Sequence, residues 1–538
     1  MKTVQAVDLT EQISPELRLA DRAPVAHVEL DDGWAGPSQK LSQLDRHTKV
    51  FLKMVRSAIE DWKKKIPSAT DVEPPQISGV VPSTDLPFGG LLLPTQDEDW
   101  PQQGIVRAAV LRMLRSGLFP MRDDDSPWDS AEEAKRAFEE ALPVNEARVQ
   151  PNHHWDEMES DEAMSRLAFA GLGALRLLPV AEADSDGAAW VSDMAFMSAF
   201  DVRPGFERYG AIAYFDSAQR PLRIHWCHAH RDVYPGDPDW NHAKWVWRCT
   251  LLVGSTVTDH LVGVHWLIGN YVTYSARSFL STDHPIRRLL KPFTWRTITI
   301  NYNATYSLCP ERGFVHRATA LKYDAMLAAM GSSVDLIQFR TVPELIARKG
   351  AGDMGDAFPW ASDASALYEL IYNFVADYVG VYFAGDAVIL DPEVRAFWSS
   401  VQSASHSVGI PELTKEHLLD VLAQFIWCVT GMHEAVGSVQ EYIIDPRFMG
   451  TKIRPGTEMS DVQASMQCLG IIGLTSLEMP KLLDDYGHVC LDAEGRASFD
   501  RFRTELGALA DRIDAANQHR RWPCNTFNPR FLEVAVAI

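Results

Sequence analysis

Imidazole side chains interrupt two of the most apolar runs of the chain. His260 and His265 occur in TDHLVGVHWLIGNY, and His433 occurs in FIWCVTGMHEAVGS. Neutral imidazole is the commonest metal ligand in proteins, and burial disfavours its charged form, so a histidine in a core helix either forms a hydrogen bond or binds a metal. A lone buried histidine is more often hydrogen-bonded. A metal site therefore needs further candidate ligands.

The end of the sequence offers one such ligand. The apolar run FLEVAVAI ends with the main-chain carboxylate of Ile538, whereas chain termini are usually polar and exposed. A buried carboxylate is strongly unfavourable unless a cation lies beside it, and a metal ion would supply that cation.

Helices must position these groups, because apolar residues at helical spacing dominate the second half of the chain. The long helical patterns run over about 240–279, 414–442 and 498–517, with Thr414 and Ser498 as candidate N-caps. The apolar segment from Leu367 to Leu390 is typical of a buried core helix. We therefore expect a mainly α fold with a few short β-strands.

The remaining elements are less regular. Tyr209 to Trp226 alternates apolar and polar residues around a turn at Asp216 and Ser217, which predicts a β-hairpin. Nearer the N-terminus, Leu44 to Lys65 has the spacing of an amphipathic helix. Pro67 to Pro101 is rich in proline and glycine, and we expect it to wrap a surface.

One domain, 1–538, fits this pattern best, with 1–100 as a peripheral helix and wrap. The aspartate-rich stretch from Pro120 to Ser130 is typical of an exposed loop. No N-terminal β-barrel domain is expected.

Composition narrows the classes of function. The chain has 538 residues, of which 46% are hydrophobic, and its formal charge of −21 opposes broad attraction to nucleic acids or anionic membranes. Charged residues throughout Met1 to Pro24 argue against a secretory or transit peptide, and no long uncharged apolar stretch predicts stable membrane insertion. Seven scattered cysteines suit free thiols in a reducing compartment. We expect a cytoplasmic protein.

Several segments, in order along the chain, resemble those of lipoxygenases. Trp266 and Leu267 follow His265, and HPIRRLLKPFTWRTITIN from His284 to Asn301 resembles the loop and helix that follow the family's metal-binding helix. The other matching segments are RYGAIAYFD from Arg208 to Asp216, the stretch from Trp240 to Lys244, GMHEAV around His433, DRIDAANQ from Asp511 to Gln518, and the C-terminal VAI. The resemblance runs over 169–538.

The resemblance implies a lipoxygenase-like catalytic domain whose metal ligands are His265, His433 and the carboxylate of Ile538. Two family ligands are replaced. A second histidine is expected five residues after the first, where this chain has Asn270, and Asn, His or Ser is expected four residues after His433, where it has Gly437. An i to i+5 pair shares a helix face only where the helix widens to π-type geometry.

What remains is two histidines and a carboxylate, the composition typical of Fe(II) sites that activate oxygen. The amide of Asn270 is a further candidate ligand. His260, Glu434, Trp266, Gly437 and Ala304 are candidates for the surroundings of the metal or for the substrate pocket. The simpler interpretation of His260 is a structural hydrogen bond, and that of Ala304 is core packing.

A second histidine-rich segment, HWCHAH, has the same ligand types in His225, Cys227, His228 and His230. In a strand, the first two side chains lie on one face and the last two on the other, so four converging ligands would require a loop. Metal binding at this segment is the weaker hypothesis.

The resemblance implies a non-heme iron oxygenase, with manganese as an alternative metal. Its partners would be O₂ and an unsaturated fatty acid, or another small organic substrate that reaches the altered metal site. The competing hypothesis is an inactive lipoxygenase-like scaffold that binds a ligand or partner. Oligomeric state and substrate identity stay open.

Overall fold

The structure of the chain is a computed structural model. It describes residues 157–180, 187–309, 311–405, 408–462 and 480–536, the short stretches 79–81, 91–93, 126–130, 132–134 and 464–465, and residues 123, 136 and 468. The predicted helix over Leu44 to Lys65 lies outside these residues, and so does Ile538.

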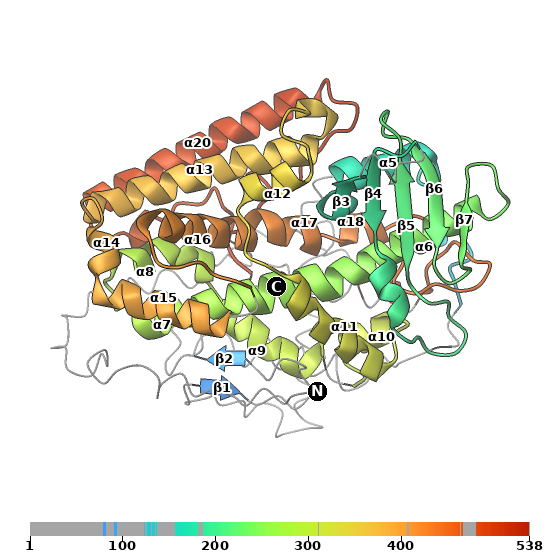
Figure 1. The fold of residues 1–538 in the computed structure, drawn as a ribbon, viewed down its shortest axis with the longest axis horizontal. Coiled ribbons are helices and arrows are strands. Elements are labelled where there is room, and N and C mark those ends of the chain that lie inside the picture. Colours follow the sequence, from blue (N-terminus) through green and yellow to red (C-terminus); the bar gives the residue numbers. More distant parts are fainter. Residues whose placement is uncertain are drawn as a thin grey trace.

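Helices make up most of the described chain, as the sequence predicts (Figure 1). Those of the first half are α5 (Asp161–Ala170), η6 (Leu172–Arg176), η8 (Ala195–Ala199), α6 (Trp240–Gly254), η9 (Ser255–Asn270), α7 (Tyr271–Phe279), α8 (Pro285–Leu290), η10 (Pro292–Thr294), α9 (Thr297–Ser307) and α10 (Phe314–Ala318). The others are α11 (Tyr323–Leu336), α12 (Val342–Arg348), η11 (Gly355–Ala357), α13 (Pro359–Tyr382), α14 (Ala387–Leu390), α15 (Pro392–Ala404), α16 (Lys415–Trp427), η12 (Cys428–Met432), α17 (His433–Gly437), α18 (Gln440–Ile443), η13 (Gly487–Val489) and α20 (Ala493–Asn517).

Seven short strands form two antiparallel sheets among the described residues. The larger sheet has the order β3 (Leu177–Pro179), β4 (Trp190–Asp193), β5 (Ala211–Phe215), β6 (Pro221–Trp226) and β7 (Arg231–Val233), and it lies at one end of the molecule (Figure 1). The predicted hairpin is confirmed, because β5 pairs with β6 across the turn that follows Phe215. The smaller sheet pairs β1 (Gly79–Val81) with β2 (Leu91–Leu93), which adds regular structure to a stretch predicted as irregular.

One continuous helical run, α6–η9–α7, passes through the centre of the fold. The middle part, η9, packs against α9, α11, η12 and α17, so it is surrounded by other helices. Its side chains are almost all buried, which agrees with its apolar sequence. By length and composition the run Trp240–Phe279 could cross a membrane, a feature that the sequence analysis missed, but 78% of its most apolar window is buried inside the protein.

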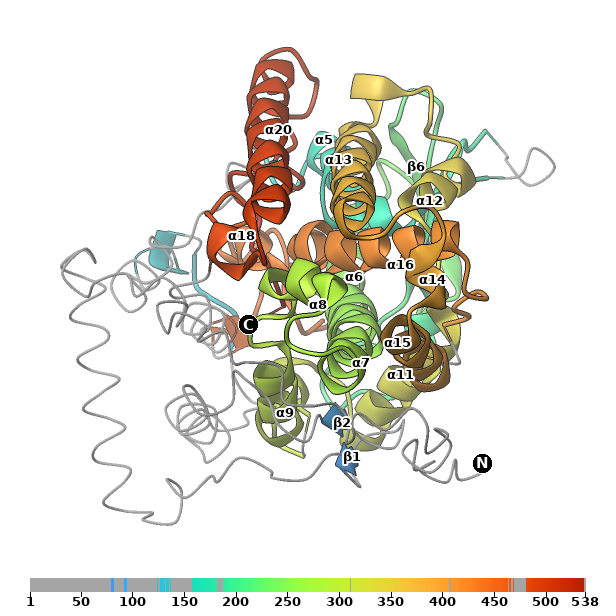
Figure 2. The same cartoon turned by 90° about the vertical axis from the view of Figure 1, so that its left-hand side faces the viewer.

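An outer helical layer covers this centre. α13 lies beside both α16 and α20, and Figure 2 shows α13 and α20 side by side. The rings of Phe374 and Phe502 stack at 4.2 Å between centroids across the α13–α20 contact. Aromatic packing of this kind adds to the burial of apolar area.

The helix boundaries refine the sequence-based predictions. Thr414 is an N-cap as predicted, because its hydroxyl accepts from the backbone N–H of His417. The predicted cap at Ser498 is wrong. α20 begins five residues earlier, where the carboxylate of Asp492 accepts from the N–H of Gly495. Ser498 lies inside the helix and donates to Asp377 at 2.6 Å.

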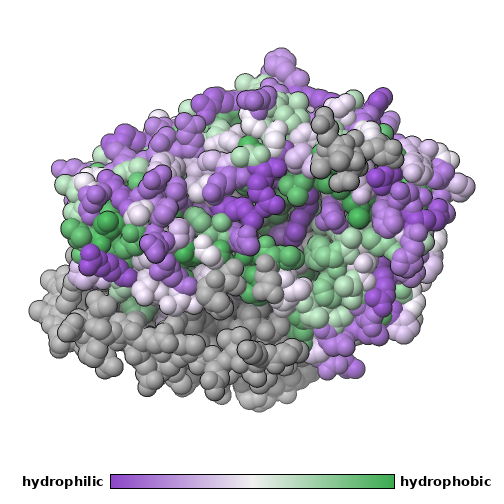
Figure 3. Space-filling view, in the orientation of Figure 1, coloured by the Kyte–Doolittle hydropathy of each residue, from purple (hydrophilic) through white to green (hydrophobic). Residues whose placement is uncertain are grey.

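The aspartate-rich stretch before Ser130 is less solvated than its composition indicates. Asp123 forms an ion pair with the largely buried Arg203, and Trp128 is buried in the core. The prediction of free thiols is confirmed for all seven cysteines. Figure 3 shows hydrophilic side chains over most of one face, with smaller apolar areas among them.

Candidate metal centre

Three imidazole rings meet at the contact between η9 and the helical run η12–α17. The ring nitrogens of His260, His265 and His433 all lie within 4.8 Å of one another. The Nε2 atom of His265 lies 3.1 Å from Nε2 of His260 and 3.3 Å from Nε2 of His433. Within the described part of the chain this is the one group of three or more His, Cys, Asp or Glu side chains with metal-binding spacing.

The helix geometry explains why His260 and His265 share a face. Residues five apart point in different directions on an α-helix, but a π-helix is wider. η9 is π-helical from Ser255 to Asn270, and η12 is π-helical from Cys428 to Met432, immediately before His433. Both segments that carry the cluster are therefore widened where the histidines need to converge.

Asn301 of α9 fixes the orientation of the His265 ring. Its Oδ1 lies 2.8 Å from His265 Nδ1, and its Nδ2 donates to the backbone carbonyl of His265 at 2.8 Å. Because an amide oxygen only accepts, Nδ1 of His265 carries the proton and Nε2 keeps its lone pair. Burial lowers the pKa of His265 to about 4, so this ring is neutral at physiological pH.

The missing side chain of Gly437 leaves room for the ring of His260. A Cβ atom at Gly437 would lie 2.9 Å from Nε2 of His260, closer than real Cβ contacts, and 3.1 Å from its Cε1, so the ring would have to shift. The position that the resemblance assigns to a ligand is therefore occupied, in space, by an imidazole from the neighbouring helix.

This arrangement suits a transition metal. Three imidazole nitrogens that lie this close together are a donor set typical of iron, zinc, copper and nickel sites. His265 is 4% exposed and His433 is 1% exposed, while His260 is half-buried. A protein core seldom places three imidazole nitrogens this close without a shared proton or a metal, since buried polar groups need partners.

The other sequence-based candidates lie around this cluster or outside the described chain. Asn270 is fully buried at the last residue of η9, and its role as a ligand stays a prediction. Glu434 is buried and accepts from the hydroxyl of Ser438, which suits a supporting role. Trp266 is buried, and Ala304 of α9 is 3% exposed.

The tail of the chain approaches the same region. Val534 to Val536 are fully buried, and Val536 lies so close to Gly269 that a Cβ there would be 3.1 Å from its Cγ2 atom. The described tail therefore packs against η9. The prediction that the carboxylate of Ile538 binds metal falls on a residue outside the described chain.

The second histidine-rich segment does not form a comparable cluster among the described residues. His225 lies on β6 and pairs with Asp232 of β7, with 2.7 Å between Nδ1 and Oδ1. His228 and His230 are exposed in the turn that joins these strands. The weaker hypothesis of a metal site at HWCHAH gains no support.

A cavity of about 360 Å³ lies beside the cluster. Asp259, Val264 and Met432, the residues immediately before the three histidines, all line it. Its other walls come from η6, β3, β4, α12, α16 and the end of α11. This volume falls in the range of about 300–1,000 Å³ that is usual for ligand sites.

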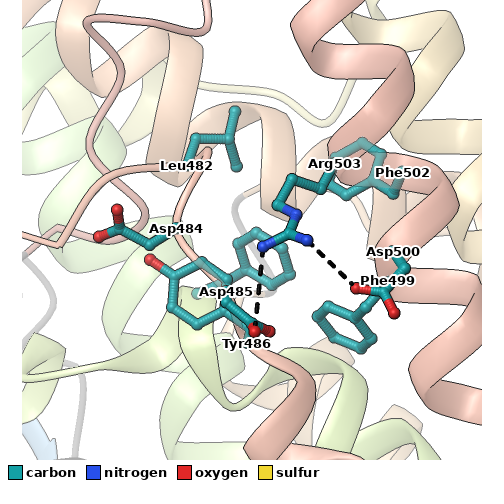
Figure 4. A pocket seen from close by; sticks show the side chains of 9 residues that line it. Leu482, Asp484, Asp485, Tyr486, Phe499, Asp500, Phe502 and Arg503 are labelled. Carbon is teal, nitrogen blue, oxygen red and sulfur yellow. Dashed lines mark ion pairs between the residues drawn. The ribbon is translucent and has the colours of Figure 1, made fainter. Parts of the chain in front are cut away.

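A second cavity, shown in Figure 4, is far smaller at about 10 Å³. Arg503 lies between Asp485 and Asp500, at 3.9 Å and 3.5 Å, so its charge is already balanced. A space of this size holds about one water molecule. It is a surface crevice of α20 and not a substrate site.

The protein is thus largely helical, with a buried histidine cluster at its centre. Comparisons with known proteins point to one family with this fold. Residues 235–444 match the family model of lipoxygenases. Linoleate 9/13-lipoxygenase of Pseudomonas aeruginosa is 24% identical over 57% of this chain and 49% of its own length. Linoleate 13S-lipoxygenase 2-1 of Solanum tuberosum is 28% identical over 38% of this chain and 26% of its own length. The chain thus spans half or less of the curated relatives that it matches.

Solved structures extend the likeness to most of the chain. Coral 8R-lipoxygenase matches with a TM-score of 0.67 at 17% sequence identity. The match covers 90% of this chain and 81% of the coral chain. A lipoxygenase variant crystallised anaerobically with arachidonate has a TM-score of 0.70 at 16% identity, with 92% of this chain and 82% of its own covered. The chain thus has the fold of the lipoxygenases, as its sequence predicts, and its residues 235–444 resemble their family model.

Two residues of the site were undervalued by sequence reasoning. His260 precedes His265 by five residues, which is the same spacing as that from His265 to Asn270, so π-type widening can bring either residue onto the face of His265. Asn301 ends the motif HPIRRLLKPFTWRTITIN, in a helix where Thr297, Thr299 and Asn303 are also polar. No signal in the sequence therefore distinguishes it from its polar neighbours.

Proposed function

We propose that this protein is a non-heme iron oxygenase that oxidises an unsaturated fatty acid with O₂. The observation that carries the proposal is the convergence of the Nε2 atoms of His260, His265 and His433 in a lipoxygenase fold. Manganese is the second candidate metal.

His260, His265 and His433 would hold the metal through their ring nitrogens, and the carboxylate of Ile538 stays the predicted anionic ligand. When bound, the metal would supply the one-electron redox change by which a hydrogen is removed from a 1,4-diene before O₂ adds. Asn301 would keep the Nε2 atom of His265 directed at the metal. Gly437 would keep the space that the His260 ring needs.

The chain's own residues also exclude water from the centre. His265, His433 and the surrounding η9 side chains are buried, so a carbon radical formed there would be protected from bulk solvent. Two named relatives act on linoleate, and one neighbour structure holds arachidonate. We extend this substrate class, a polyunsaturated fatty acid, to the present chain.

The test is O₂ consumption by the iron-loaded protein with linoleate and, as a matched control, with stearate, which has no double bond. We expect O₂ uptake and a conjugated-diene product with linoleate only, and we expect His433→Ala to abolish both. Metal binding without any O₂ uptake across a panel of dienes would instead favour the alternative, a lipoxygenase-like scaffold that binds a ligand without oxidising it.

A further inference from the structure

Two residues that line the cavity of about 360 Å³ carry polar atoms with no hydrogen-bond partner in the described part of the chain. The atoms are the indole Nε1 of Trp427 and the side-chain oxygen Oε1 of Gln424, and both are buried. Among the described residues that line the cavity, no other buried side-chain nitrogen or oxygen lacks a partner. Because buried polar groups are seldom left unpaired, these two atoms indicate a polar group on the ligand of the cavity.

One helix, α16, carries both groups. Gln424 and Trp427 are three residues apart, so their side chains are neighbours on the helix surface, with roughly 5–6 Å between Cβ atoms in such a pair. Cys428 follows on the same face and also lines the cavity. A single small group on a ligand can therefore reach both polar atoms.

Packing holds the ring of Trp427 in place. The side chain is 2% exposed, and its ring stacks on that of Phe527 with 5.7 Å between centroids. The ring of Phe527 in turn packs against Trp360 at 5.1 Å. The indole cannot turn toward another acceptor without losing these contacts, so its N–H is a preorganised donor.

The cavity wall near these atoms is otherwise apolar. Val264 and Ile268 of η9 and Met432 of η12 line the same cavity. A plain acyl chain would pack well against these three residues, but it would cover the indole N–H and the amide oxygen with methylene groups. Polar groups that lose water without gaining a new partner disfavour such a complex.

A hydroxyl group complements this pair of atoms. The indole N–H only donates and the amide oxygen only accepts, whereas a hydroxyl oxygen accepts one hydrogen bond and donates another. A carbonyl group on the ligand would pair with Trp427 alone, because it has no hydrogen to donate to Gln424.

We therefore infer that Gln424 and Trp427 are specificity-determining residues that select a fatty acid with a hydroxyl group along its chain. The inference rests on the proposed function for the fatty-acid class and narrows that class. A reaction that adds oxygen to the chain, by oxygenation or by hydration of a double bond, must then supply the substrate.

The experiment is equilibrium dialysis of the full-length, metal-loaded protein with stearate and with a set of monohydroxystearates whose hydroxyl lies at different carbons. These acids have no diene, so binding is measured without oxidation. We expect one or more of the hydroxy acids to bind about tenfold or more tightly than stearate. The keto acid with oxygen at the same carbon should bind with intermediate affinity.

Two variants assign the hydrogen bonds. Gln424→Leu should remove the advantage of the hydroxy acid over the keto acid, because the acceptor is lost at similar side-chain size. Trp427→Phe should remove the advantage of both oxygenated acids over stearate, because the donor is lost. Gln402→Leu on α15 is the matched control, since this amide donates to the carbonyls of Ile410 and Pro411 outside the cavity lining, and it should change none of the affinities.

Equal binding of stearate and all the hydroxy acids would overturn the inference. A preference for the hydroxy acid that persists unchanged in both Gln424→Leu and Trp427→Phe would overturn it as well. If the protein still oxidises linoleate in either case, the proposed function stands. Hydroxyl-selective binding without O₂ uptake with any diene would support the inference and contradict the proposed function.

Discussion

At the scale of single residues, Gly437 decides which side chains fit into the histidine cluster. It lies four residues after His433, and its lack of a Cβ atom leaves the space that the His260 ring fills. A side chain at position 437 would overlap the His260 ring in its observed position, so the two cannot be present together. The glycine at the position where the resemblance predicts a ligand is therefore coupled to the position of a histidine on another helix.

Gly437→Ala should displace His260 and weaken metal binding by about tenfold or more, the size of effect usual when the support of a ligand is lost. The measurement is metal affinity by competition with a chelator. Gly380→Ala on α13 is the matched control, because open space surrounds that glycine. Alanine favours a helix more than glycine does, so Gly380→Ala should not melt earlier than the unchanged protein. Unchanged metal affinity in Gly437→Ala would show that the ring has room to move and would contradict this account.

The residue types of the site could be predicted from sequence. Which of these residues lie next to one another could be predicted only in part. His265 and His433 stand out because each lies in an apolar run. The choice between His260 and Asn270 as the partner of His265 could not be made, because both lie five residues away and helix widening can bring either onto the shared face. Asn301 was beyond reach, since its contact depends on how α9 packs against η9.

At the scale of elements, a buried lysine ties the cavity wall to α13. Nζ of Lys349 donates to the backbone carbonyls of Ala174, Leu175 and Leu177, at 2.7, 2.7 and 2.8 Å. These carbonyls belong to η6 and the start of β3, whose Leu175 and Leu178 line the cavity. The ammonium group also lies 5.6 Å from the ring centre of Trp360 on α13. Loss of this side chain would remove the shared donor of three carbonyls, of which that of Ala174 would keep the backbone N–H of Leu177.

Lys349→Met should lower the free energy of unfolding by about 3 kcal/mol at neutral pH, because buried acceptors lose their donor. Burial also lowers the pKa of Lys349 to about 7, from an ordinary value near 10.5. Between these two pKa values, Lys349 carries a proton in the unfolded chain but not in the folded chain. Its contribution to the free energy of unfolding therefore rises with pH over this range. Denaturant titrations of both proteins from pH 7 to 10 should show the gap between them widening. A gap that narrows over this range would mean that the charged ammonium is the stabilising form.

Element types could be predicted better than element ends. The helical run over 240–279 and the hairpin around Asp216 follow directly from apolar periodicity. The predicted run over 414–442 is helical only as far as Gly437, because it breaks at Ser438 and Val439 before the short helix α18. The start of α20 was misplaced because Asp492 and Ser498 are both good capping residues, and tertiary contact with Asp377 draws Ser498 into the helix. The length of the π-helical segment could not be predicted, since it depends on packing around η9.

At the scale of the whole molecule, a large helical body surrounds one central helix, and the five-stranded sheet covers one end of it (Figure 1). Lipoxygenase structures share this arrangement at 16–17% identity, so the fold persists while most side chains differ. The mainly α prediction was correct because helical periodicity is retained even where individual ligands change. The contacts between distant segments, such as η9 with η12 and the tail, come only from the tertiary structure.

The measurement that tests the central claim most directly is the iron and manganese content per chain of the freshly purified protein, of His260→Ala and of Asn270→Ala. The account predicts close to one metal ion per chain in the unchanged protein, loss of most of it in His260→Ala, and retention in Asn270→Ala. His260→Ala and Asn270→Ala truncate residues at equal distance along the chain from His265, so each serves as control for the other. Metal retained in His260→Ala but lost in Asn270→Ala would contradict the three-histidine centre and would support Asn270 as the ligand.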